Sequence, residues 1–358
     1  MSLFQSFLST KTIGIDVGTS AIKCLIGTLK KKQFLVESFF SLPIDNDLHD
    51  DRSVKNPDVL GQKIAEALSQ LTNKKLACSS ALKGANVLTK RVTIPKISKK
   101  EIPDQVRWEA EQVFTQNIEN ITVDYILLGE SAQLPGAPAG TPGWDLLLVG
   151  VRTDYSEQIQ SLFHLNQVEL KCLDIDAFCV GDFLEKAMDL SSDLPIAFVD
   201  IGASGTRVSV RHKGNIVFIR EFAIGGRHFT QSIAQSLGLA FEDAEALKLG
   251  GAASFPENAQ VALRPEFVAW KNELQQCEDV YVSQESNAMI EKWFFFGGAM
   301  MTPGLMESLK GERIANKIKI LPAHELLVPA PKAKFNPNEL KQWSARLITA
   351  AGLCGRVN

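Results

Sequence analysis

The sequence predicts an α/β protein made of two related halves with further inserted segments, and three observations support this prediction. At 358 residues the chain is longer than the roughly 250 to 300 residues at which single cores stop growing. Its 45% hydrophobic and 22% charged residues are typical of an ordinary globular protein. Residues 13–39 also align without gaps with residues 197–223, at a constant offset of 184.

The two aligned segments share identical residues where each forms a turn between strands. These identical pairs are Asp16 and Asp200, Gly18 and Gly202, and Ser20 and Ser204. A backbone that approaches phosphate needs small residues, because larger side chains would block its N–H groups. An Asp beside the turn can hold Mg²⁺ through water. We therefore expect two facing turns that hold a metal-bound polyphosphate, with two plain β-hairpins as the alternative.

Composition excludes several other classes of protein. A net charge of −3 gives no support for nucleic-acid binding. The longest uncharged apolar runs, such as 293–301, are shorter than the roughly 18 residues of a membrane-spanning helix, so we expect no transmembrane segment. Six cysteines without a CxxC pair predict reduced thiols in a cytoplasm. Leu3, Phe4, Phe7 and Leu8 form a narrow apolar stripe that packs on the protein itself or touches lipid or a partner.

Four short motifs resemble those of the ATP-binding fold shared by actin, 70-kDa heat-shock proteins and sugar kinases. Residues 16–23, DVGTSAIK, are similar to its first phosphate loop, and residues 200–206, DIGASGT, to its second. Residues 294–305, FFFGGAMMTPGL, resemble its adenosine motif, and residues 244–248, AEALK, a helix beside the ribose. The resemblance implies an actin-like ATPase fold: two RNase H-like domains with inserted subdomains and nucleotide in the central cleft.

This resemblance implies that ATP and Mg²⁺ are the ligands of the cleft. Asp16 and Asp200 are expected to hold Mg²⁺ through water, and Lys23 to offer its charge to the phosphates. Glu245 is expected to accept ribose hydroxyls and Lys248 to lie along the base, with a solvated ion pair as the alternative. The expected nucleotide-binding residues are Asp16, Gly18, Thr19, Ser20, Lys23, Asp200, Gly202, Ser204, Thr206, Glu245, Lys248, Gly297, Gly298 and Ala299.

Asp176 is the candidate for positioning the water that would hydrolyse ATP. It precedes a predicted helix, at the place where actin-like ATPases put a polar water-positioning residue. The alternative is that Asp176 is only the N-cap of a helix over 177–186. We expect slow turnover at most, with nucleotide acting mainly as a ligand that shifts the balance between two conformations.

Three further segments resemble the PilM family, actin-like proteins of bacterial type IV pilus assembly that are related to the division protein FtsA. They are residues 90–128, 195–250 and 347–352. The resemblance implies a cytoplasmic ATP-binding adaptor, peripheral at the inner membrane, which binds the N-terminal cytoplasmic tail of a PilN-like membrane protein. Pilus motor ATPases are further partners that it implies. Ala203 departs from the hydroxyl or charged residue of many relatives and leaves the second loop fewer side-chain donors.

The expected domain bounds follow from this resemblance. The first actin-like domain comprises 1–50, 146–190 and 335–358, with 51–145 as an inserted subdomain; the second comprises 194–239 and 291–332, with 240–290 as its insertion. The family's peptide groove is implied to lie in the first insertion. Its expected wall is the 101–116 helix, through Val106, Ala110 and Val113, with core packing as the alternative.

Two other functions fit the same superfamily. A small-molecule kinase would need an acidic base beside a substrate hydroxyl, and the sequence shows no convincing acid for this role. An FtsA-like filament-forming protein would need contacts between copies, which are a matter of surface geometry that no motif encodes.

Overall fold

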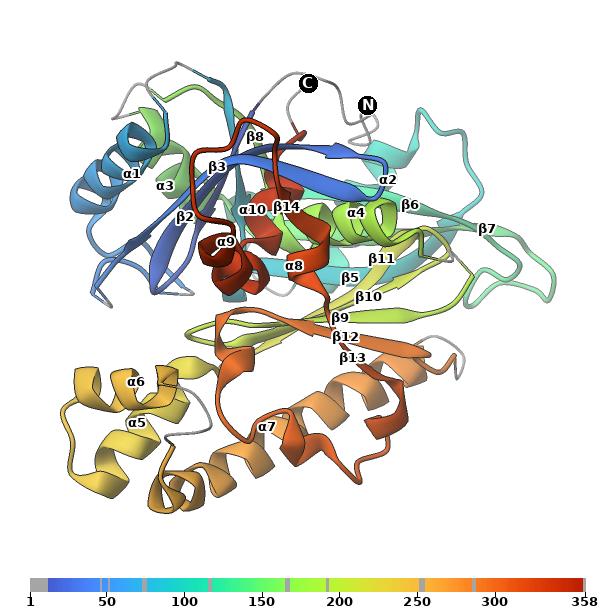
Figure 1. Cartoon of the computed structure of the whole chain (residues 1–358). Coiled ribbons are helices and arrows are strands. Elements are labelled where there is room, and N and C mark those ends of the chain that lie inside the picture. Colours follow the sequence, from blue (N-terminus) through green and yellow to red (C-terminus); the bar gives the residue numbers. More distant parts are fainter. Residues whose placement is uncertain are drawn as a thin grey trace.

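The computed structural model describes residues 12–45, 47–50, 52–72, 76–114, 118–164, 168–190, 193–250, 255–284 and 288–356. The apolar stripe at residues 3–8 lies outside this part of the chain. Two mixed sheets stand one above the other, and a smaller sheet lies beside them (Figure 1). Within the described segments, no helix has both the length and the apolar character needed to cross a bilayer.

The first domain is built on a six-stranded sheet in the order β14-β3-β2-β1-β4-β8. β1 to β3 form an antiparallel meander, and β4, β8 and β14 pair in parallel with their neighbours. The strands are β1 (Ile13–Val17), β2 (Ala21–Lys30), β3 (Gln33–Pro43), β4 (Cys78–Leu82), β8 (Leu170–Ile175) and β14 (Leu327–Pro329).

The second domain repeats this arrangement in a five-stranded sheet, in the order β11-β10-β9-β12-β13. β9 to β11 form the antiparallel meander, and β12 and β13 follow in parallel. The strands are β9 (Ile196–Ile201), β10 (Thr206–His212), β11 (Asn215–Phe222), β12 (Lys292–Phe296) and β13 (Ile318–Ile320). The duplication predicted from the sequence is therefore confirmed.

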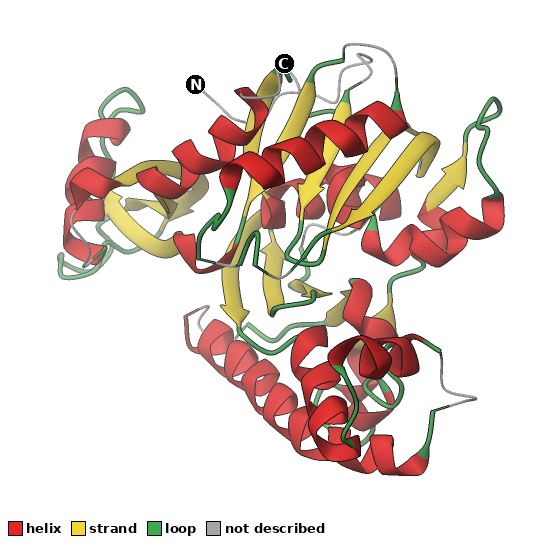
Figure 2. Ribbon diagram, turned by 90° about the vertical axis from the view of Figure 1, so that its left-hand side faces the viewer, coloured by secondary structure: helices red, strands yellow, loops and turns green. Residues whose placement is uncertain are grey.

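Helices form three layers around and between these sheets (Figure 1 and Figure 2). α4 and α10 pack between the sheets, α1 and α3 cover the outer face of the first sheet, and α5 and α7 cover that of the second. The helices are α1 (Pro57–Leu71), α3 (Thr153–His164), α4 (Asp176–Met188), α5 (Gly226–Leu237), α6 (Phe241–Leu249), α7 (Glu257–Gln284), α8 (Ala323–Leu326), α9 (Pro337–Trp343) and α10 (Ile348–Leu353).

The inserted subdomain is a three-stranded sheet, β5-β7-β6, with α2 packed on one face. Its elements are β5 (Val87–Pro95), α2 (Ile102–Val113), β6 (Ile121–Ser131) and β7 (Gly143–Arg152). It begins later than the expected 51–145, because α1 and β4 belong to the first domain, and it ends later, because β7 continues in the subdomain sheet to Arg152. The sequence of β4 is CSSAL, and all five residues are buried. Its two serines interrupt the apolar pattern by which a buried strand is recognised in a sequence. The Ser80 hydroxyl is satisfied by donating to the Ile15 carbonyl at 2.9 Å.

Two other bounds differ from expectation. The chain returns to the first domain by β14, within the segment 291–332 that the sequence suggested for the second domain. The long helix α7 was expected in an insertion at 240–290, yet its buried residues, including Trp270 and Leu274, belong to the core of the second domain. Both differences arise because no residue pattern in the sequence marks the domain to which a short edge strand or a core-facing helix belongs.

Candidate functional site

A cleft of about 550 Å³ lies where the turns of the two domains meet. It brings together all four sequence motifs, which come from distant parts of the chain. Of the expected nucleotide-binding residues, those that line the cleft are Asp16, Gly18, Thr19, Ser20, Lys23, Asp200, Gly202, Ser204, Glu245, Lys248, Gly297, Gly298 and Ala299.

Thr206 is the expected ligand residue that does not reach the cleft. Its hydroxyl donates to the Ile224 carbonyl at 2.7 Å and accepts from Trp270 Nε1 at 2.9 Å, inside the second domain. Successive residues of a strand point to opposite faces, so Thr206 points to the core when Arg207 points to the cleft. The expectation for Thr206 is therefore wrong: it holds β10 and α7 together.

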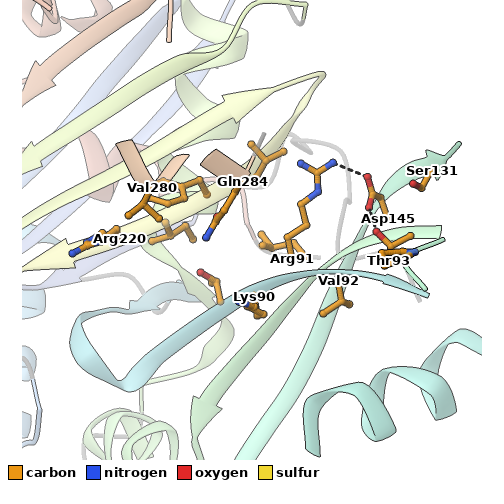
Figure 3. A pocket seen from close by; sticks show the side chains of 15 residues that line it. Lys90, Arg91, Val92, Thr93, Ser131, Asp145, Arg220, Val280 and Gln284 are labelled. Carbon is orange, nitrogen blue, oxygen red and sulfur yellow. Dashed lines mark hydrogen bonds and ion pairs between the residues drawn. The ribbon is translucent and has the colours of Figure 1, made fainter. Parts of the chain in front are cut away.

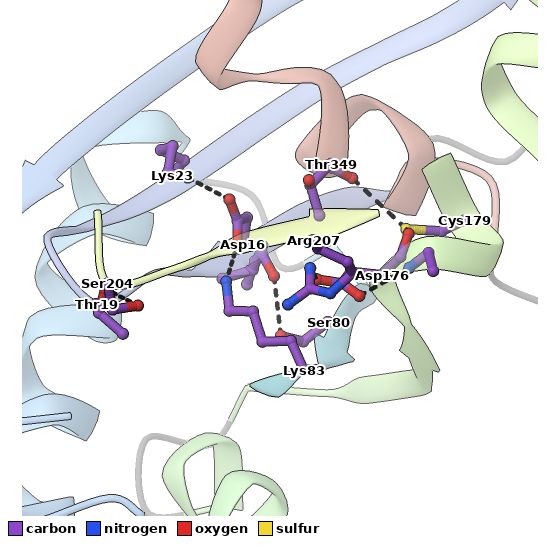
Figure 4. Close-up of polar contacts among 12 residues, drawn as sticks. Asp16, Thr19, Lys23, Ser80, Lys83, Asp176, Cys179, Ser204, Arg207 and Thr349 are labelled. Carbon is purple, nitrogen blue, oxygen red and sulfur yellow. Dashed lines mark hydrogen bonds and ion pairs between the residues drawn. The ribbon is translucent and has the colours of Figure 1, made fainter. Parts of the chain in front are cut away.

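The first turn places a carboxylate between two lysines (Figure 4). Asp16 lies on β1 opposite Lys23 of β2, which bonds it, and Lys83, directly after β4, bonds its other oxygen at 2.6 Å. Burial by itself would raise the pKa of Asp16, but the two ammonium groups outweigh burial and hold this pKa well below its usual range. Lys83 belongs to no sequence motif, so the sequence does not indicate this contact.

The second turn presents a carboxylate with a different environment. Within the described residues, Asp200 forms no hydrogen bond or ion pair through its side chain. Burial raises its pKa, although Arg207 and Lys23 act in the opposite direction. Each turn is closed in the same way, because the Gly18 amide donates to Ala21 at 3.0 Å and the Gly202 amide to Gly205 at 2.9 Å.

Arg207 connects the second turn to the candidate catalytic residue. Its guanidinium donates to the carboxylates of Asp176, the first residue of α4, and of Glu221 on β11. Asp176 lines a small cavity behind Arg207 rather than the main cleft, and its carboxylate also accepts from the Ala177 amide at 2.7 Å. Burial raises the pKa of Asp176 to about 7, against the effect of Arg207 and Lys83. The 184-residue offset, which places Arg207 on Lys23, could have revealed this residue.

The two turns touch each other across the cleft. The Thr19 hydroxyl donates to the Ser204 hydroxyl at 3.1 Å, and the Arg227 guanidinium, at the start of α5, donates to the Thr19 carbonyl. Arg227 also lines the cleft, and no sequence motif indicated it. The side chains of both domains therefore close this end of the cleft together.

The glycines after β12 shape another wall. Gly297 has a φ of +98°, and a Cβ there would lie 2.4 Å from Asp200 Oδ1, so only glycine fits. A Cβ on Gly298 would meet nothing closer than the Arg346 side chain at 3.6 Å. The Arg346 guanidinium lies over the Trp343 ring, 4.8 Å from its centre. Bare backbone and an aromatic ring thus face the same space.

The α6 pair, Glu245 and Lys248, forms the remaining wall. Lys248 Nζ donates to Glu245 at 2.7 Å, to the Thr230 hydroxyl at 2.6 Å and to the Gly226 carbonyl at 2.9 Å. Its side chain is 5% exposed, which excludes the alternative of a solvated ion pair. Burial lowers the pKa of Lys248, although Glu245 opposes this effect.

The residues expected to form a partner groove on α2 lie inside the subdomain. Val106 and Ala110 are buried against the three-stranded sheet, and Val113 is half-buried beside them. A groove wall through these side chains is therefore not what the structure shows. Their spacing of four and then three residues along a helix is equally typical of a core face.

A second pocket, of about 640 Å³, lies between the inserted subdomain and the second domain (Figure 3). Residues of β5 and β7 face residues of β11 and α7 across it. β5 and β11 are each at the edge of their sheet. Arg91 bonds Asp145 at 2.6 Å within the pocket, and Lys90 and Arg220 add further positive charge. No sequence pattern indicated this pocket, because its walls come together only through folding.

Known proteins resemble this chain at three levels. Residues 14–357 match the family described as Type IV pilus assembly protein PilM. The cell division protein FtsA of Rhizobium meliloti (strain 1021) is 33% identical over 95 residues, which are 26% of this chain and 22% of FtsA. The ethanolamine utilization protein EutJ of Escherichia coli (strain K12) is 25% identical over 130 residues, which are 36% of this chain and 42% of EutJ. The chain spans less than half the length of these two curated relatives.

Solved structures show the same fold. A PilM–PilN type IV pilus biogenesis complex superposes with a TM-score of 0.81 at 22% identity, over 97% of this chain and 98% of that one. MreB5 of Spiroplasma citri bound to ADP gives a TM-score of 0.50 at 10% identity, over 96% and 95%. These likenesses confirm the expected actin-like ATPase fold.

The family match begins in β1 and runs past α10, so it takes in both sheets, both turns and the inserted subdomain. The chain therefore belongs to the PilM family of type IV pilus assembly proteins.

Proposed function

We propose that this protein is a cytoplasmic, ATP-binding adaptor of the inner-membrane platform of type IV pilus assembly. In this proposal it binds Mg-ATP in the central cleft, and the N-terminal tail of a PilN-like membrane protein holds it at the membrane. The observation that carries the proposal is the pair of facing turns, which place bare glycine backbone and charged side chains of both domains around one cleft.

The glycines support a nucleotide as the guest. The need for glycine at position 297 follows from the protein itself, because a Cβ there would clash with Asp200. The fold does not explain the glycine at position 298, because it leaves room for a side chain there. A ligand lying flat on the backbone explains a glycine at this position. The Trp343 ring and the Arg346 guanidinium stacked on it line the same cleft, and planar groups of this kind can stack on a base.

Charge supports a phosphate-bearing ligand with a metal ion. The cleft is lined by Lys23, Lys83, Arg207 and Arg227, which can bind phosphate oxygens. Asp200, without a partner among the described residues, is the carboxylate best able to hold a metal-bound water. Mg²⁺ bound here would neutralise part of the phosphate charge. Slow hydrolysis at most is expected, because Asp176 lies behind Arg207 and is bonded to it.

The pocket between β5 and β11 supports a peptide partner. Edge strands carry unpaired backbone N–H and C=O groups, and an extended peptide can add to such an edge. Here two edges face one pocket, so one extended segment can pair with either strand. The structural likeness to a PilM–PilN complex makes the tail of a PilN-like protein the natural occupant.

Isothermal titration with Mg-ATP tests the nucleotide part. The wild-type protein should bind Mg-ATP, and the Asp200→Asn variant should bind it at least about tenfold more weakly, because one charge-assisted contact is lost. Lys310→Glu, an exposed change outside the cleft, is the matched control and should bind as the wild type does. Absence of Mg-ATP binding by the wild-type protein would end this part of the proposal.

Fluorescence anisotropy with a labelled peptide of the PilN-like tail tests the partner part. The peptide should bind, and the same peptide with alternate backbone nitrogens methylated should not, because strand addition needs its N–H donors. Lys90→Glu with Arg220→Glu reverses two charges that line the pocket and should change the affinity for the peptide, whereas Lys310→Glu should not. Equal binding of the methylated peptide would rule out strand addition in this pocket.

A further inference from the structure

Arg207 occupies in the second hairpin the place that Lys23 occupies in the first. Lys23 lies opposite Asp16 across β1 and β2, and Arg207 lies opposite Asp200 across β9 and β10. Their bonds differ, however. Lys23 bonds the aspartate opposite it, whereas the Arg207 guanidinium bonds carboxylates elsewhere. The duplication has therefore produced two cations with different tasks.

The two carboxylates that Arg207 bonds belong to different domains (Figure 4 shows the first). Asp176 begins α4, in the first domain, and Glu221 lies on β11, in the second. The Arg207 side chain is 12% exposed, and it lines both the main cleft and the small cavity that contains Asp176. An anion that reaches this end of the cleft must compete with both carboxylates for the same guanidinium.

The chemistry of the three cations at this end separates their roles. Lys23 and Lys83 share Asp16, and an ammonium group acts as a point charge with no preferred number of acceptors. A guanidinium is a planar fork that binds two oxygens of one phosphate at once. A terminal phosphate offers more free oxygens than an internal one, so the fork favours a terminal phosphate.

We propose that Arg207 is the residue by which this cleft distinguishes a nucleoside triphosphate from a diphosphate. Its guanidinium exchanges a carboxylate for the third phosphate, which a diphosphate does not supply. This inference rests on the proposed nucleotide-binding function and adds to it the specificity of the site. Asp176, released from Arg207 in this exchange, becomes able to interact with water in the small cavity.

The test compares the affinities of Mg-ATP and Mg-ADP by isothermal titration. The wild-type protein should bind Mg-ATP about 10- to 100-fold more tightly than Mg-ADP, the range expected for a charge-assisted bidentate contact. In Arg207→Gln the ratio should fall to about one, with Mg-ADP affinity changed by less than about threefold. Arg207→Lys, which keeps the charge but not the fork, should give an intermediate ratio.

Glu221→Gln should not lower the preference for Mg-ATP over Mg-ADP, in contrast to Arg207→Gln. It removes a competitor for Arg207, so the preference for Mg-ATP should equal or exceed that of the wild type. Because Arg207→Gln leaves two part-buried carboxylates unpaired and can fail to fold, the double variant Arg207→Gln with Asp176→Asn serves as a second form of the test. It should fold and should show a ratio of about one.

The outcomes separate the two proposals. A wild-type protein that binds neither nucleotide overturns the proposed function and this inference together. A wild-type protein that binds both equally, or a ratio that persists in a folded Arg207→Gln or double variant, overturns the inference alone. Loss of the preference in these variants together with retained Mg-ADP binding supports it.

Discussion

Asp16 and Asp200 lie at matching places in the two hairpins, yet the structure gives them different energetic roles. Asp16 is bonded by Lys23 and Lys83, whereas Asp200 has no side-chain partner in the described chain. The two aspartates are therefore identical in the sequence repeat but differ in their ion pairing, because their neighbours differ. We infer that Asp16 mainly stabilises the fold, and we propose that Asp200 serves the ligand.

We expect Asp16→Asn to lower the free energy of unfolding by about 3 kcal/mol, because two part-buried ammonium groups lose their partner. Asp200→Asn should change it by less than about 1 kcal/mol. Urea unfolding without nucleotide measures both values, and Mg-ATP titration of the same samples should show weaker binding in each variant. Equal losses of stability in the two variants would contradict this difference in roles.

His49 gives a prediction about pH. This residue is 1% exposed and lies beside Gly18 of the first turn; burial, helped by Lys83, lowers its pKa to about 4. The unfolded chain takes up this proton at about pH 6.5, before the folded chain does. The free energy of unfolding contributed by His49 is therefore present above pH 6.5 and is lost as the pH falls toward 4.

His49→Gln should lack this pH dependence. Between pH 7 and pH 4 the wild-type protein should lose roughly 3 kcal/mol more of its unfolding free energy than the variant does. Urea unfolding at several pH values measures the difference, and subtracting one curve from the other removes the contributions of all shared groups. Parallel curves for wild type and variant would show that His49 titrates normally.

At the scale of elements, the link from β12 into the following 3-10 turn, Gly298–Met301, contains two adjacent glycines with different reasons to be glycine. Gly297 has a backbone conformation and a contact with Asp200 that no side chain tolerates. Gly298 faces the cleft, where the protein leaves room. The fold therefore requires glycine at the first of these positions, and at the second we propose that a ligand requires it.

Alanine substitution should separate these reasons. Gly297→Ala should lower the free energy of unfolding by about 1 to 3 kcal/mol, the cost of a strained backbone conformation, and should also disturb Asp200. Gly298→Ala should change stability by no more than about 0.5 kcal/mol while weakening Mg-ATP binding about tenfold. Thermal unfolding and titration of both variants test this, and unchanged Mg-ATP affinity in Gly298→Ala would argue against a nucleotide on this backbone.

At the scale of the whole molecule, the cleft and the second pocket lie between the same two parts of the protein. Each lies between the first domain, with its inserted subdomain, and the second domain. Strand β11 contributes to both, because Glu221 lines the cleft and residues 217–220 line the pocket. A ligand that fixes the two domains in one site therefore lowers the cost of ordering them for the other.

This arrangement predicts that Mg-ATP promotes partner binding. Saturating Mg-ATP should raise the affinity of the protein for the PilN-like tail peptide about 5- to 20-fold. Linkage requires that the peptide raise the affinity for Mg-ATP by the same factor. In Glu221→Gln both factors should fall toward one, because the contact between Arg207 and β11 is removed. Anisotropy and calorimetry measure the two factors, and a peptide affinity that is independent of Mg-ATP would exclude the coupling.

By itself, the sequence determined the features that depend on neighbouring residues. The turn at Asp16-Val17-Gly18, its copy at residues 200–202, the glycines after β12 and the duplicated halves could all be read from it. These are properties of local backbone chemistry, which demands small residues wherever they occur. The fold class followed from the resemblance that these motifs carry. The expected nucleotide-binding residues line the cleft apart from Thr206, whereas Lys83, Arg207 and Arg227 line it without having been indicated.

The tertiary structure decided everything that depends on which distant segments meet. It placed Lys83 on Asp16, turned Arg207 toward Asp176, and put β4 in the first sheet despite its serines. It also moved Val106 and Ala110 into a core and formed the pocket between β5 and β11 instead. The physical reason is that burial, ion pairing and edge-strand availability belong to a residue's surroundings, and those surroundings exist only after folding.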